Sequence, residues 1–204
     1  MSRAVEESYR PGRDPLLEAG WQYMAPTTLD EFRTSDWETL NAQRETYRAR
    51  TLCEQVLRLL SASKDDATFG YQINKYHHSL QTATLMLRDG LPEEDVMLGL
   101  LHDIGFTLCP DTHAEFAACV IGPYLSERNE WILRQHPIFQ THHIHGYAGL
   151  DERAREQFNG HPWFEDCANF VARYDVVSID PDIEVAPLSF FEPMVQRFFA
   201  KPKR

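Results

Sequence analysis

The stretch Leu98-Gly-Leu-Leu-His-Asp-Ile-Gly105 decides the fold class of this chain. An apolar segment of helical character runs directly into His102 and Asp103, and Gly105 then ends it. Neighbouring side chains on a helix point about 100° apart, so a His-Asp doublet can share one metal ion only near a helix end that faces a cavity. The stretch therefore predicts a buried helix whose last residues bring polar ligands into a core.

On both sides of this stretch, apolar residues recur at helical spacing. No window of strand length alternates valine or isoleucine with polar residues, as a half-buried strand requires. Capping boxes are expected at Thr28–Glu31 and Ser35–Glu38. The predicted fold class is all-α, with an N-terminal arm over residues 1–26 and a helical body over residues 27–204. The expected helices cover residues 38–61, 72–88, 92–103, 112–125, 127–142, 150–157, 162–178 and 189–199.

Composition restricts the classes of partner. The 204 residues include 20 Lys and Arg against 31 Asp and Glu, a formal net charge of −11. Such a chain lacks the basic face that nucleic acid or an anionic membrane surface attracts. It has no apolar run of membrane-spanning length, and its first residues lack the apolar segment of a secretory signal. With four cysteines and no CxxC pair, we expect a cytoplasmic protein with a small-molecule partner, no nucleic acid and no membrane.

Further polar residues fall on the helices around the His-Asp doublet. Asp175 continues an apolar stripe formed by Phe164, Ala168 and Val171, where a carboxylate is costly unless it is paired or binds a cation. Histidines lie on the expected helices before and after the doublet. Five helices would each offer an inward donor, as in metal sites of helical bundle cores. The expected metal ligands are His78, His102, Asp103, His113, His136 and Asp175.

In order and spacing, these six residues are similar to the ligand pattern of the HD-domain superfamily. More narrowly, they resemble the HD-domain mixed-valent diiron oxygenases, the group of myo-inositol oxygenase and the phosphonate-cleaving oxygenases. The resemblance covers residues 68–178, the ligand-bearing core of an HD-domain helical bundle. The local sequences that carry the resemblance are Ile73-Asn74, His78-Ser-Leu-Gln-Thr-Ala, then Leu-Leu-His-Asp-Ile-Gly, and then Phe164-Glu-Asp-Cys.

The resemblance implies two iron ions, with Mn2+ or other divalent metals as alternatives that also suit imidazole and carboxylate ligands. It implies that His78, His102 and Asp175 bind the first metal and that His113 and His136 bind the second. Asp103 would bridge the two.

The activity that the resemblance implies is an oxygenase that uses O2 to cleave a C–C or C–P bond of a small hydroxylated substrate. The alternative is a metal-dependent HD phosphohydrolase acting on a nucleotide or other phosphate ester, where the metal lowers the pKa of a bound water. Basic residues converging on the pocket would favour the hydrolase. An intact ligand set disfavours a third class, a non-enzymatic binding protein on an HD scaffold. No catalytic residue is assigned beyond the metal centre.

Substrate contacts depart from those of the phosphonate-cleaving oxygenases. That group carries a Tyr and a Glu where this chain has Thr68 and Tyr71. It holds the phosphonate with a His, a Lys and an Arg where this chain has Phe106, Gln140 and Ala172. Because a phosphonate dianion needs charge-assisted donors, we expect a hydroxy acid, a polyol or a zwitterion instead. Lys75 and Arg173 are expected at the surface or in ion pairs. The residues expected to contact substrate are Tyr71, Gln140, His142 and His143.

Overall fold

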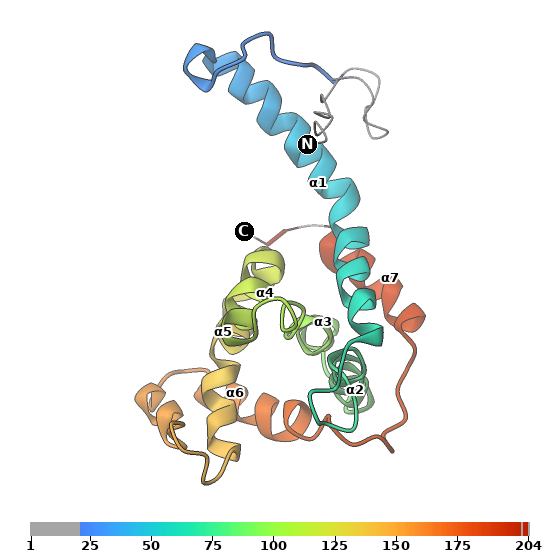
Figure 1. The fold of residues 1–204 in the computed structure, drawn as a ribbon, viewed down its shortest axis with the longest axis vertical. Helices are drawn as coiled ribbons and strands as arrows, with labels where there is room; N and C mark the ends of the chain where they lie inside the picture. Colours follow the sequence, from blue (N-terminus) through green and yellow to red (C-terminus); the bar gives the residue numbers. More distant parts are fainter. Residues whose placement is uncertain (1–20, 201, 204) are drawn as a thin grey trace, which may run out of the picture. The chain divides into compact units, whose positions relative to one another are not determined.

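The computed structural model describes residues 21–200 together with residues 202 and 203 (Figure 1). Within these residues every regular element is a helix and no strand occurs, which confirms the predicted all-α fold class. The chain divides into a first unit that ends at Thr51 and a second unit that begins at Leu52. Of the arm expected over residues 1–26, residues 1–20 lie outside the described part of the chain.

The first unit contains the beginning of α1 (Thr34–Ala62), which starts four residues before the expected helix. The Asp36 carboxylate accepts a hydrogen bond from the backbone N–H of Arg33 at 2.9 Å, which satisfies one free amide at this helix start. The expected capping box at Thr28 is wrong. Thr28 makes no capping hydrogen bond through its side chain, and only a 3-10 turn, Leu29–Glu31, follows it. Ser35 lies inside α1 rather than before it.

The second unit contains the remaining helices, and their starts show how the sequence sets them. The side chain of Asn74 accepts the backbone N–H of His77, and that of Ser126 accepts the backbone N–H of Asn129, so both cap a helix. Pro92 precedes a third helix whose first turn is acidic, which suits the positive end of the helix dipole. The helices are α2 (Lys75–Arg88), α3 (Glu93–Leu101), α4 (His113–Ile121), α5 (Glu127–Gln140), α6 (Phe164–Phe170) and α7 (Leu188–Phe199).

Helix packing in this unit surrounds the polar residues with apolar side chains. Helix α2 packs on α3, α4 packs on α5, and α5 packs on α6. The close approach of α2 and α3 depends on Gly99, because a Cβ there would overlap the Met86 sulfur and lie 3.2 Å from Thr82 Cγ2. Fully buried neighbours include Ala83, Val96, Leu100, Leu101 and Leu133. These residues come from α2, α3 and α5 and belong to one close-packed apolar core.

Two expected helices differ in the structure. Residues 150–157 were expected to be α-helical, but the segment forms only a 3-10 helix, Ala154–Phe158. The helix expected over residues 162–178 is α-helical as far as Phe170 and continues as a π-helical turn, Val171–Asp175. A π turn takes more residues per turn than an α-helix, so it changes the direction in which the following side chain points.

Two further features of the described residues bear on the expectations from composition. No helix among them combines the length and the apolar composition needed to cross a bilayer. The four cysteines are free thiols, and of these only Cys167 is fully buried.

Candidate metal centre

The six expected ligands come from five separate segments and meet at one place. His78 lies on α2, His102 and Asp103 directly follow α3, and the other three residues lie further along the chain. His113 is the first residue of α4, His136 lies on α5, and Asp175 ends the π-helical turn. None of the six is more than 6% exposed. The structure thus brings two carboxylates and four imidazoles together in the core.

Each of the four imidazoles is oriented by a hydrogen bond from its Nδ1 atom to a backbone carbonyl, at 2.6–2.8 Å. Because Nδ1 carries the proton in such a bond, Nε2 of a neutral ring is left with a bare lone pair. For His102, His113 and His136 the carbonyl lies three residues earlier in the chain, so the local helix or turn itself aims the ring. The carbonyls belong to Ser178, Gly99, Pro110 and Leu133, for His78, His102, His113 and His136 in turn.

The bare nitrogens face one another in two pairs. Nε2 of His78 lies 3.2 Å from Nε2 of His102, and Nε2 of His113 lies 3.1 Å from Nε2 of His136. Two lone pairs at this distance repel each other, so each buried pair requires either a shared proton or a bound cation. This arrangement fits metal binding.

The Asp103 carboxylate lies between the two imidazole pairs. Its Oδ1 atom is 3.2 Å from Nε2 of His113 and 3.5 Å from Nε2 of His136. Its Oδ2 atom is 3.5 Å from Nε2 of His78. Oδ1 is buried and has no hydrogen-bond partner among the described residues. A buried carboxylate oxygen without a donor is costly, and a cation would satisfy it.

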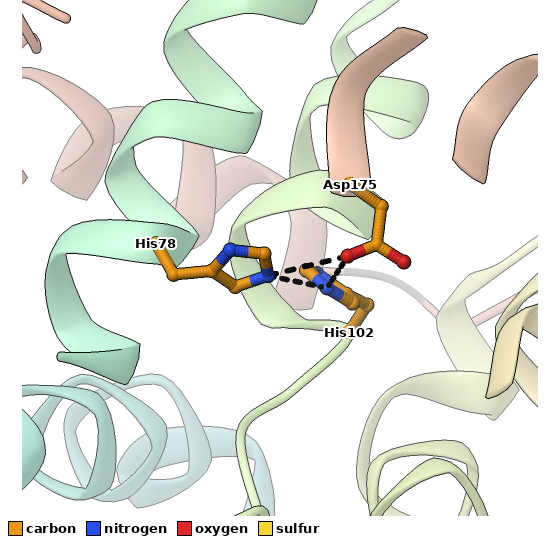
Figure 2. A group of neighbouring side chains, drawn as sticks. All are labelled: His78, His102 and Asp175. Atoms are coloured by element: carbon orange, nitrogen blue, oxygen red, sulfur yellow. Dashed lines mark hydrogen bonds and ion pairs between the residues drawn. The ribbon is translucent and has the colours of Figure 1, made fainter. Parts of the chain in front are cut away.

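Asp175, at the end of the π-helical turn, points its carboxylate towards the rings of His78 and His102 (Figure 2). Its Oδ1 atom lies 3.4 Å from Nε2 of His78 and 3.6 Å from Nε2 of His102. Its Oδ2 atom accepts a hydrogen bond from the Gln140 amide at 2.6 Å. The ligand atoms of these three residues all lie within 4.8 Å of one another, and the same holds for His102, Asp103 and His136. Either group could hold a metal ion, and the two groups share His102.

Electrostatics keep both aspartates ionised. Burial alone would raise the pKa of Asp103, but the Lys75 ammonium and the neighbouring imidazoles outweigh it and hold the pKa well below its usual range. For Asp175, burial is likewise outweighed by His102 and His78, and its pKa also lies well below the usual range. Both carboxylates are therefore in the form that binds cations.

A cavity of about 340 Å3 opens beside His78 and Asp175. Of the four expected substrate contacts, Tyr71, Gln140 and His143 line it. Tyr71 is 58% exposed, and the buried Nε2 of His143 has no hydrogen-bond partner among the described residues. His142 is not among the described residues that line the cavity, because its ring turns towards the backbone carbonyl of Glu152, 3.3 Å from Nδ1.

Lys75 is the cavity residue whose position the sequence analysis missed. Its Nζ atom lies 2.7 Å from Asp103 Oδ2 and 4.2 Å from the centre of the Phe106 ring. Burial disfavours the ammonium, but Asp103 outweighs it, and the pKa of Lys75 lies above its ordinary value. The ion pair was expected, while the place in the cavity was not. The signal was its position three residues before His78, which puts both side chains on one helix face.

Arg173, the other cation expected at the surface or in an ion pair, is exposed and pairs with Asp89 at 2.6 Å. It does not line the cavity. Of the two cations, Lys75 therefore places its positive charge next to the candidate metal centre, and Arg173 does not.

Comparison with models of known protein families gives no match for this chain, and a search of curated proteins gives none either. What characterises the chain is its all-α fold around a buried cluster of histidine and aspartate that could hold metal.

Proposed function

We propose that this chain is an HD-domain dinuclear iron oxygenase, which uses O2 to cleave a C–C or C–P bond of a small hydroxylated substrate. One observation carries the proposal: two pairs of bare imidazole nitrogens flank a single buried carboxylate. A mononuclear centre would use one such pair and leave the other unsatisfied. Mixed imidazole and carboxylate ligands suit iron or manganese rather than a structural zinc.

The residues divide into two sets of ligands around Asp103. His78, His102 and Asp175 would hold the first metal, and His113 and His136 would hold the second, with Asp103 shared by both. When bound, two irons would supply the redox chemistry by which O2 takes four electrons from the substrate, so no external reductant is needed.

The surrounding groups orient the ligands. The carbonyl acceptors at Nδ1 fix the tautomer and the ring plane of each histidine and make Nε2 a better donor to metal. The Gln140 amide holds Asp175 in place. The rings of Phe170 and His102 pack edge to face with their centres 5.5 Å apart, which places a buried apolar ring on that side of the centre.

The cavity supports a small substrate that approaches the first metal, because His78 and Asp175 form part of its wall. Its volume of about 340 Å3 is near the lower end of ligand cavities in general, about 300–1,000 Å3. In a phosphohydrolase we expect basic residues to converge on the cavity and help hold phosphate. Lys75 is the only lysine or arginine among the described residues that line the cavity, which favours the oxygenase over the hydrolase.

The test is parallel measurement of O2 uptake and phosphate release by protein purified anaerobically and loaded with Fe(II). The panel contains hydroxyphosphonates, hydroxy acids, polyols and nucleotides, with no reductant added. We expect O2 uptake with a hydroxylated compound, its loss in His113→Ala, and its retention in the control His145→Ala, whose ring lies in an exposed segment. Phosphate release from nucleotides without O2 uptake would overturn the proposal.

A further inference from the structure

We infer that Lys75 selects the substrate, and that the cavity takes a small hydroxylated carboxylate whose carboxylate group pairs with the Lys75 ammonium. The inference rests on the proposed function, since it names the substrate class for that same site. It selects the hydroxy acids among the expected substrates.

Lys75 is placed to accept an anion. Its side chain is 22% exposed, and it lies in the wall of the cavity. An ammonium has three N–H donors, and among the described residues Asp103 is the one hydrogen-bond acceptor that the structure gives it. Phe106 covers another side through its ring face, which attracts the cation without accepting a conventional hydrogen bond. Donor capacity of the ammonium therefore remains, and Lys75 lines both this cavity and a smaller one of about 140 Å3 that Asp103 also lines.

The charged side chains of the cavity wall point to Lys75 as the group that attracts an anion. Besides Lys75, the charged side chain among the described residues of the wall is Asp175, and both carboxylate oxygens of Asp175 already face His78, His102 or Gln140. The Lys75 ammonium can compensate one carboxylate, and a metal held beside the cavity would add further positive charge.

The remaining wall combines polar and apolar side chains. Thr68, Tyr71, Asn74, Gln140 and His143 can form hydrogen bonds to substrate hydroxyl groups, whereas the apolar side chains favour burial of methylene groups. Each buried methylene group should tighten binding about fourfold. The apolar lining residues are Phe69, Ile73, Phe106, Ile144, Val176 and Ile179.

The test is anaerobic calorimetric titration of the iron-loaded full chain, so that no turnover is needed for a signal. The probes are 2-hydroxyhexanoate, its neutral analogue hexane-1,2-diol, and the shorter 2-hydroxybutanoate. The variants are Lys75→Met and Lys75→Gln, which remove the charge, and Lys75→Arg, which keeps it. Lys64→Met is the matched control, because Lys64 does not line the cavity. Iron content is measured for every sample, and Lys75→Gln retains a donor for Asp103.

We expect wild type and Lys64→Met to bind 2-hydroxyhexanoate more tightly than the diol, and more tightly than 2-hydroxybutanoate. Removing the charge should weaken binding of the acid about ten- to hundredfold, which is the size of the contribution from a hydrogen bond to a charged group. Binding of the diol should not change. Lys75→Arg should restore the preference for the acid.

Several results would overturn the assignment. Lys75→Met or Lys75→Gln protein that binds the acid as tightly as wild type would show that Lys75 serves only Asp103. Wild-type protein that binds the diol as tightly as the acid would refute it without any variant. Expected binding of the acid without O2 uptake would instead refute the oxygenase and leave the Lys75 assignment standing. O2 uptake with a polyol that is the same in wild type and Lys75→Gln would support the oxygenase and refute the Lys75 assignment.

Discussion

Removing the metal from the iron-loaded protein should lower its melting temperature, because the two imidazole pairs would lose the cation that satisfies them. In each pair the Nε2 atoms lie 3.1–3.2 Å apart in the core. If each pair is counted as one unsatisfied contact that costs about 1–3 kcal/mol, the two pairs together amount to about 2–6 kcal/mol. For a chain of this size, 1 kcal/mol corresponds to about 2–4 °C, so we expect a fall of about 4–24 °C.

The assay is a thermal melt of the loaded and the chelated protein at pH 8, where fewer protons compete with metal for the imidazoles than at lower pH. Iron content is measured before each melt. His145→Ala should show the full effect of chelation, because this residue lies outside the cluster. His113→Ala should show a smaller effect, because one of the two pairs is already gone. An unchanged melting temperature after verified removal of iron would refute the reasoning that places a metal in the core.

Other predictions address single residues and pH. Asp103→Ala should lose both metals, measured as iron per chain, because the carboxylate serves both; retention of two would contradict a shared ligand. His113→Ala should retain one metal and lose O2 uptake, and full activity with one metal would exclude dinuclear chemistry. Gly99→Ala should destabilise the protein by about 1–3 kcal/mol in a denaturant melt, because its Cβ would overpack α2 against α3; an unchanged midpoint would contradict that contact. Burial opposes protonation of His102 and His113, but Asp103 outweighs it and raises the pKa of both. Metal must displace these protons, so the Kd measured at pH 6 should exceed that at pH 8, and equal values would contradict imidazole ligation.

Helical periodicity was sufficient to predict the fold class and most helices, because each helix buries one face against the same core. The ends were harder to place. Helix α1 begins at Thr34 rather than at residue 38, and the Asp36 carboxylate caps its start. The sequence analysis instead expected Ser35 to cap the helix. Residues 154–158 form a 3-10 helix rather than an α-helix, and the spacing of apolar residues does not distinguish the two.

Convergence of the polar residues could be anticipated because each was expected on a different helix of one bundle. The π-helical turn that ends at Asp175 could not, since it depends on tertiary packing rather than on a local signal. The same limit applies to the pocket. The ring of His142 turns to the backbone carbonyl of Glu152, which no local pattern indicates. Lys75, by contrast, could have been placed near the site from its position three residues before His78.

The most direct test of a dinuclear centre is anomalous scattering at the iron edge from crystals of the anaerobically loaded protein. We predict two iron peaks per chain, the first bonded by His78, His102 and Asp175 and the second by His113 and His136, with Asp103 bonded to both. A single peak, or His113 and His136 turned away from any metal, would contradict the account.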